Sequence, residues 1–165
     1  MALVTEDGTG LSTAESFASV SQADTRLAAL GYTNWANLTT TEREQALRRA
    51  TAYMEQSYRS RWKGTRLLRA QALSWPRYGV ISDTFYVEST IVPAEVVNTC
   101  IDLAFKAAAG DLSPDLSRAT IREKVGPLET EYSPHSPQAV RYISADNALA
   151  PFLKGGPGMV TLVRS

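Results

Sequence analysis

The sequence contains a single cysteine and a single histidine among its 165 residues. One cysteine excludes an intramolecular disulfide. Cys100 lies in an apolar run with helical spacing, so we predict that it is a small core residue. His135 lies in a segment rich in Pro and Ser, which argues against a Cys–His pair or a Ser–His–Asp triad. Glu129 and Glu131 could bind a cation, but surface solvation is the favoured interpretation. We therefore expect no enzymatic activity, no cofactor and no metal.

Long apolar runs are also missing. None reaches the roughly 20 residues that a membrane-spanning helix needs. The first residues do not resemble a signal peptide, so we expect a soluble intracellular protein. The formal charge is balanced, with 17 basic and 17 acidic residues. With 44% apolar residues, the chain can bury the core of one compact domain.

The charges are unevenly distributed along the chain. Residues 1–42 hold five acids and one base, whereas the stretch Arg43–Arg77 holds nine basic residues and two acids. Such a stretch is typical either of a core helix with a solvated basic face or of a surface that meets nucleic acid or an acidic protein. Charge alone favours the first interpretation. The acidic arm and the basic stretch could pair between copies or fold together within one chain.

Three runs with apolar residues at helical spacing predict a helical core. They cover Ser21–Leu30, Thr41–Tyr58 and Pro93–Ala109. Ser21 and Thr41 are expected to cap the first two helices, and Thr41 with Glu44 forms a capping-box pattern. Gly31 is expected to end the first helix and Gly110 the third, Gly110 in the left-handed conformation. The expected fold is mainly α.

The segments between and after these helices are less regular. Thr33–Thr40 is predicted to be a polar connection and Gly79–Thr90 an ordered loop. Ile121–Tyr132 predicts a β-hairpin around Gly126-Pro127. A short helix is predicted over Ala145–Lys154, with Pro151 near its end. The result is a small helical bundle with a β-hairpin, assigned to residues 1–154, followed by an extended C-terminal tail over residues 155–165.

The tail begins with the helix-breaking run GGPG at residues 155–158. The β-prone residues that follow are Met159, Val160, Thr161, Leu162, Val163 and Arg164. A short β-prone segment after a glycine-rich break is typical of a docking strand that adds to the sheet edge of a neighbour. The alternative is a disordered terminus, which the sequence alone favours.

Several short patterns occur together in a fixed order. They are EDGTGL at 6–11, SFASVSQAD at 16–24, ALRRATAYME at 46–55, RWKGTRL at 61–67, LSWPR at 73–77, IVPAEVV at 91–97, AGDLSPDL at 109–116 and EKVGPLETEY at 123–132. This combination resembles a tailed-phage protein family that is often labelled DnaT-like single-stranded-DNA-binding protein. It is also similar to the phage head–tail adaptor (connector, head-completion) proteins. The resemblance covers the chain from about Leu3 to Leu153.

The resemblance to adaptors implies a structural virion protein in the neck of a bacteriophage, made in the host bacterial cytoplasm. Its copies would form a ring, usually a dodecamer, between the portal protein and a tail or stopper protein, with double-stranded DNA in the channel and no membrane contact. It implies no enzymatic activity and no cofactor. The C-terminal tail, Met159 to Arg164, would then dock on the portal or on an adjacent subunit.

The alternative hypothesis is a module that coats single-stranded DNA through Arg and Trp side chains within Arg48–Trp75. Such a protein usually carries net positive charge and exposed aromatic residues. This chain is neutral, and Trp62 and Trp75 lie beside Gly and Pro in expected packing corners, so the adaptor is favoured. Under either hypothesis the candidate partner or DNA contacts are Arg48, Arg49, Arg59, Arg61, Lys63, Arg66 and Arg69.

Overall fold

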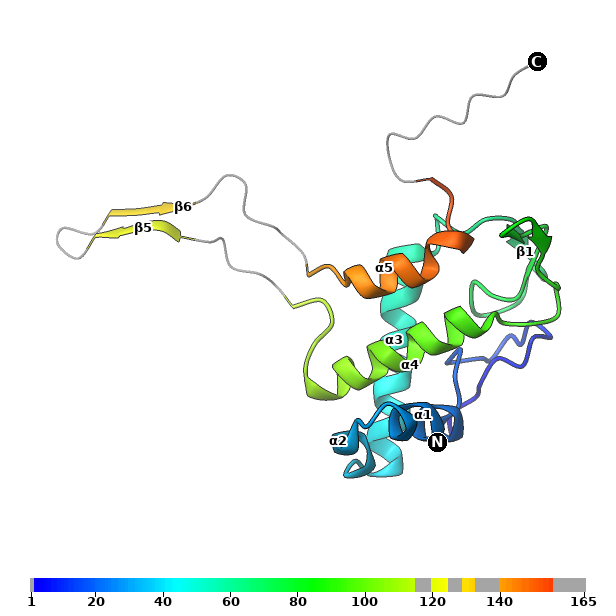
Figure 1. Ribbon diagram of the computed structural model, residues 1–165, viewed down its shortest axis with the longest axis horizontal. Coiled ribbons are helices and arrows are strands. Elements are labelled where there is room, and N and C mark those ends of the chain that lie inside the picture. Colours follow the sequence, from blue (N-terminus) through cyan, green and yellow to red (C-terminus); the bar gives the residue numbers. More distant parts are fainter. Residues whose placement is uncertain (1, 115–119, 125–128, 133–139, 156–165) are drawn as a thin grey trace, which may run out of the picture.

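The computed structural model of the chain describes residues 2–114, 120–124, 129–132 and 140–155. These residues form five α-helices, one 3-10 helix and three two-stranded antiparallel sheets, which confirms the expected mainly α fold with a small β-hairpin. Two long helices, α3 (Thr40–Tyr58) and α4 (Ala94–Ala109), cross in the middle of the body (Figure 1). They make the most extensive pairing between any two elements.

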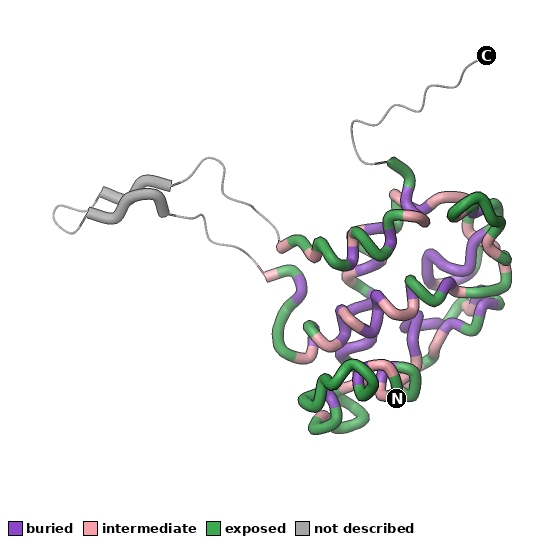
Figure 2. Tube along the Cα trace, in the orientation of Figure 1, coloured by how far each residue is buried: buried purple, intermediate pink, exposed green. Residues whose placement is uncertain are grey.

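The centre of the core lies where α3 and α4 face each other. Apolar residues three or four positions apart fall on one side of each helix, and these sides are buried (Figure 2). The buried residues include Ala46, Leu47, Ala50, Met54 and Tyr58 from α3, and Val96, Cys100, Ile101, Leu103 and Ala104 from α4. The prediction that Cys100 is a core residue is therefore confirmed.

Two of the helices, α1 and α3, begin with a reciprocal capping box. α1 (Val20–Ala29) begins after Ser19, which accepts a hydrogen bond from the backbone of Gln22, while the Gln22 side chain accepts from Ser19. α3 begins after Thr39, which is paired in the same way with Glu42. The caps predicted from the sequence lie two residues further along, already inside the helices. An N-cap residue has an extended backbone, and Ser19 and Thr39 have this conformation, which identifies them as the caps.

Glycine acts differently at the ends of α1 and α4. Gly31 follows α1 with φ +78°, as expected for a residue that ends a helix in the left-handed region. Gly110 follows α4 with φ 176°, so its predicted left-handed conformation is wrong and the chain leaves α4 extended. The connection after α1 also contains a short helix, α2 (Thr33–Ala36), where the sequence predicted none. Trp35 of α2 is buried, and its indole N–H donates to Asp24.

Residues 79–90, predicted to be an ordered loop, contain the second of two short hairpins. β1 (Thr65–Arg66) pairs with β2 (Arg77–Tyr78), and β3 (Ile81–Ser82) pairs with β4 (Phe85–Tyr86). The two residues at the β3–β4 tip, Asp83 and Thr84, have φ +49° and +71°. Two central residues with positive φ form the turn that suits a two-residue hairpin loop.

The C-terminal part of the described chain returns to the end of α3. α5 (Ile143–Leu149) continues into the 3-10 helix η1 (Ala150–Phe152), so the helix predicted over 145–154 starts earlier and ends in a tighter turn. Leu153 then forms an antiparallel bridge with Trp62. The predicted hairpin is confirmed as β5 (Thr120–Lys124) paired with β6 (Glu129–Tyr132). Within the described residues, no helix is long and apolar enough to span a bilayer.

Candidate nucleic-acid interface

The acidic N-terminal region neutralises much of the basic helix within the same chain. Asp24 accepts from Arg43 at 3.1 Å, and Glu15 accepts from Arg48 at 2.9 Å. The one base of the N-terminal region, Arg26, pairs in turn with Asp102 of α4 at 2.9 Å. The acidic arm and the basic stretch therefore fold together in one molecule, the second of the two possibilities that the charge pattern left open.

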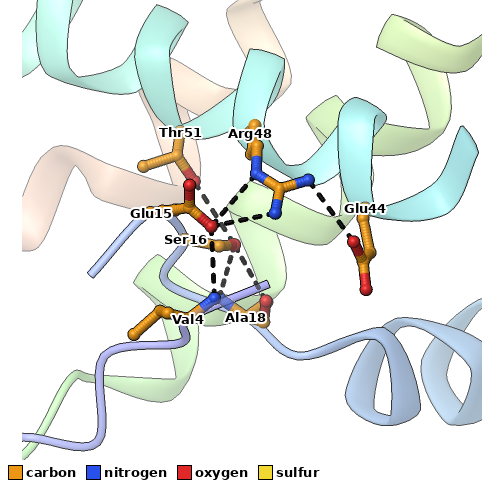
Figure 3. A network of polar contacts seen from close by, with 7 residues as sticks. All are labelled: Val4, Glu15, Ser16, Ala18, Glu44, Arg48 and Thr51. Carbon is orange, nitrogen blue, oxygen red and sulfur yellow. Dashed lines mark hydrogen bonds and ion pairs between the residues drawn. The ribbon is translucent and has the colours of Figure 1, made fainter. Parts of the chain in front are cut away.

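Arg48 shows how completely such a side chain is engaged (Figure 3). Its Nε and one terminal nitrogen donate to Glu15 Oε2 at 3.1 and 2.9 Å, and the other terminal nitrogen donates to Glu44 at 3.4 Å. Glu15 also accepts from the backbone N–H of Val4. The hydrogen bonds from Arg48 lower the pKa of Glu15, and the bond to Glu15 raises the pKa of Arg48. This predicted DNA or partner contact instead fastens the N-terminal segment to α3.

The buried guanidinium of Arg77 organises the segment that follows α3. Its nitrogens donate to three backbone carbonyls, those of Lys63 at 2.7 Å, Gly64 at 2.8 Å and Ser74 at 3.0 Å. Burial lowers the pKa of Arg77, and the charge of Arg66, its cross-strand neighbour, acts in the same direction. The sequence grouped Arg77 with the surface arginines, because nothing in a run of letters shows that three carbonyls converge on it.

The tryptophans of this segment belong to the core. Trp62 and Trp75 are 1% and 0% exposed. Their rings pack edge to face with centroids 5.7 Å apart, and Trp75 packs in the same way on Phe152 with a centroid distance of 5.8 Å. Their expected position in packing corners is confirmed. The part of the DNA-binding hypothesis that used these two rings for stacking on bases is therefore wrong.

Three cations at the β1–β2 hairpin lack an acidic partner. Lys63 donates from Nζ to the backbone carbonyls of Pro151 at 2.7 Å and Ile81 at 3.3 Å, which leaves its charge uncancelled. Arg66 lies opposite Arg77, and Arg69 is exposed. In the part of the chain that the structure describes, none of these three forms an ion pair. Like charges gathered without acids create a local positive field.

An exposed aromatic side chain lies on the same hairpin as these cations, on the other side of the strands from Arg66. Tyr78 of β2 is 68% exposed and pairs across the hairpin with Thr65, next to the Arg66–Arg77 pair. The close approach of the two strands depends on Gly64, whose φ is +65° and whose missing Cβ would lie 2.3 Å from the Tyr78 carbonyl oxygen. We call the part of this hairpin that carries Lys63, Arg66, Arg69 and Tyr78 the basic face.

The other predicted contact residues are less available or lie elsewhere. Arg59 and Arg61 approach Glu55 and Asp146, each at 3.9 Å. Arg49 is exposed but lines a small hollow with Asp111, away from the basic face. The candidate docking tail, Met159 to Arg164, lies outside the described residues and stays a prediction, as does the division of the chain at residues 154 and 155.

Catalytic and metal chemistry find little support in the described residues. No group of three His, Cys, Asp or Glu side chains there could hold a metal ion. The thiol of Cys100 contacts the hydroxyls of Thr51 at 3.3 Å and Ser16 at 3.9 Å, deep between the helices. Burial raises its pKa, which disfavours the reactive thiolate.

Together these features define a small, mainly α protein that presents a basic face, with an exposed tyrosine, on a short β-hairpin. A model of the family described as "Putative DnaT-like ssDNA binding protein" matches residues 1–165, so the chain belongs to this family. Searches of the curated proteins and of the solved structures find no match.

Proposed function

We propose that this protein binds single-stranded DNA through the basic face. The family description supports this function, and it favours the second of the two sequence-based hypotheses over the adaptor ring. The structural observation that carries the proposal is the set of cations at Lys63, Arg66 and Arg69, which lack carboxylate partners within the described residues, on the same hairpin as the exposed ring of Tyr78. The tryptophans have no part in it.

The chemistry divides between backbone and bases. Arg66 and Arg69 hold phosphates, while Lys63, tied to two carbonyls, adds a fixed positive charge. A base of the strand stacks on Tyr78, and stacking of this kind contributes about 1–3 kcal/mol per base with little regard to sequence. A duplex keeps its bases stacked on one another, so the tyrosine adds nothing there. Single strands are therefore preferred, and the sequence preference is weak.

Fluorescence anisotropy with a labelled thymidine homopolymer of about twenty nucleotides tests the proposal, with salt varied between about 50 and 200 mM. Each phosphate contact contributes roughly 0.7 to the slope of log affinity against log salt for single strands. We expect Arg66→Ala and Arg69→Ala each to reduce the slope by about that amount. Arg49→Ala and Lys106→Ala are matched controls, since both remove exposed cations away from the basic face.

The contribution of Tyr78 to binding is tested separately from that of the cations. Tyr78→Ala should weaken binding by about 1–3 kcal/mol without changing the salt slope, whereas Tyr78→Trp should retain binding. Equal losses for the control and basic-face variants would show that binding is diffuse and that the basic face is wrongly placed. No binding of the wild-type protein to single strands at low salt would refute the function itself.

A second candidate is the head–tail adaptor, a structural protein whose copies form a ring between the phage portal and a tail or stopper protein. Two observations favour an assembly role. Arg43 and Arg48 are paired with acids of the same chain, which makes them less available to phosphates. The β3–β4 hairpin also exposes large apolar side chains, which are typical of protein contacts. Negative-stain imaging of the protein alone and with a portal tests this candidate, and a monomer that ignores the portal contradicts it.

A further inference from the structure

An open apolar groove runs between α1 and the start of α4. Its volume is about 830 Å³, and its walls include Leu30 on one side and Ile91 and Val97 on the other. Leu30 is 51% exposed and Ile91 41%. Arg26 is the charged residue of the lining, and it is held in place by Asp102. The groove is therefore a hydrophobic depression whose one guanidinium is already paired with a carboxylate.

The β3–β4 hairpin is the complementary feature. Phe85 and Tyr86 are 75% and 78% exposed, the highest values among the large apolar side chains of the described residues. Ile81 lies opposite Tyr86 and Ser82 opposite Phe85, so the two rings point to opposite faces of the hairpin. The tip carries an exposed carboxylate, that of Asp83. The hairpin is an apolar projection with a negative end.

Charge separates this hairpin from the basic face. A carboxylate at the tip disfavours close approach of phosphates, so the exposed rings of this hairpin suit a protein surface better than nucleic acid. The hairpin cannot enter the groove of its own chain. Val87 bonds back to Val80, and both Val87 and Val92 pack on the core, so the six residues from Tyr86 to Ile91 are anchored near both ends. The occupant must come from another molecule.

The contact area agrees with a second copy of the chain. An aromatic side chain buries about 150–250 Å² when fully covered, so two rings that are three-quarters exposed offer on the order of 300 Å². With Ile81, the tip and the groove walls, one seated hairpin buries on the order of 1,000 Å² in total, near the lower limit for specific interfaces. Reciprocal seating of two hairpins doubles this to roughly 2,000 Å², which is ample for a stable dimer.

We propose that the β3–β4 hairpin of one copy seats in the groove between α1 and α4 of a second copy. The contact does not depend on DNA binding, and it names the surfaces that the ring of the second candidate function would need. A hairpin and a groove on the same chain are self-complementary, so the contact either closes a dimer or continues from copy to copy.

Analytical ultracentrifugation of three proteins tests the contact. The hairpin variant is Phe85→Ser with Tyr86→Ser, and the groove variant is Leu30→Glu with Ile91→Glu. All four positions are exposed, so circular dichroism and melting temperature should stay unchanged. Each variant alone should lose association, or show a dissociation constant raised at least about a hundredfold, which corresponds to roughly 2.7 kcal/mol.

Mixing makes the test specific. The hairpin variant keeps its groove and the groove variant keeps its hairpin, so an equimolar mixture should form one-to-one dimers. Ile143→Ser, which removes an exposed apolar side chain from α5, should associate like the wild type. The proposal is overturned if wild-type protein is monomeric at about 100 μM, a weak-affinity limit, or if the mixed variants fail to pair. DNA binding measured on the hairpin variant reports separately on the basic face.

Discussion

Replacing Arg77 by Met should destabilise the protein by about 3–4 kcal/mol. The three carbonyls that Arg77 satisfies differ in access to water. The bond to Ser74 is buried, so losing it leaves an acceptor unpaired at a cost of about 1–3 kcal/mol. The carbonyls of Lys63 and Gly64 are partly buried, so water can replace the guanidinium there and each loss costs about 1 kcal/mol. Relief from burying the charge offsets part of this sum.

Urea denaturation followed by circular dichroism measures this change. For a chain of this size, a loss of 3 kcal/mol lowers the melting temperature by roughly 6–12 °C. Arg49→Met is the matched control, because Arg49 is exposed and should change stability by less than about 0.5 kcal/mol. Arg77→Lys should recover only part of the loss, since a single ammonium does not reproduce the guanidinium fork. A loss below about 1 kcal/mol for Arg77→Met would show that these hydrogen bonds do not hold the segment together.

The fold also predicts the effects of two substitutions and the rate of one chemical reaction. Ile101→Asp should cost more than about 3 kcal/mol, because it buries a carboxylate without a partner; an unchanged melting temperature would contradict the placement of α4. Gly64→Ala should cost at least about 1–2 kcal/mol more than Gly31→Ala, since both have positive φ but only the Gly64 Cβ meets the Tyr78 carbonyl; equal losses in chemical denaturation would refute the close approach. Cys100 should react with a thiol reagent only as fast as the protein opens, and rapid labelling of native protein would contradict its burial.

The long helices were predictable because their sequences repeat one signal many times. The expected ends of α1, α3 and α4 each lie within one residue of the observed ends. The buried side of α4 also follows from its apolar spacing. The packing of Trp62 and Trp75 was also foreseen from the Gly and Pro beside them. In each case several neighbouring residues indicate the same structure.

The region from the end of α3 to Ile91 was not predictable in the same way. Each of its strands has two residues, which is too short for any alternation to show. The tip residues Asp83 and Thr84 are not the Asn-Gly pair that usually marks this turn. The strands β1 and β2 meet because Arg77 draws distant carbonyls together, and such convergence depends on tertiary structure.

The electrostatic site was predicted only in part. The sequence grouped Lys63, Arg66 and Arg69 with Arg48 among the candidate contacts, and it could not show that Arg48 is paired within the fold. Residues 33 positions apart, such as Glu15 and Arg48, neutralise each other only after the chain has folded. Charge counted along a sequence therefore overstates the charge available to a partner.

The pair formed by Glu15 and Arg48 has a consequence for how the molecule opens. Val4 and Thr5 are joined to the body by the contact of Val4 with Glu15 of this pair and by a bridge between Thr5 and Ser16. Residues 14–18, like α3 and α4, are held by buried apolar side chains. Salt screens the first kind of attachment and leaves the second nearly intact. Ser16, which contacts the thiol of Cys100, is itself buried next to Phe17, so release of Val4 and Thr5 leaves the thiol covered. Ionic strength thus sets how often the first residues detach from an otherwise folded molecule, while the global free energy of unfolding changes little.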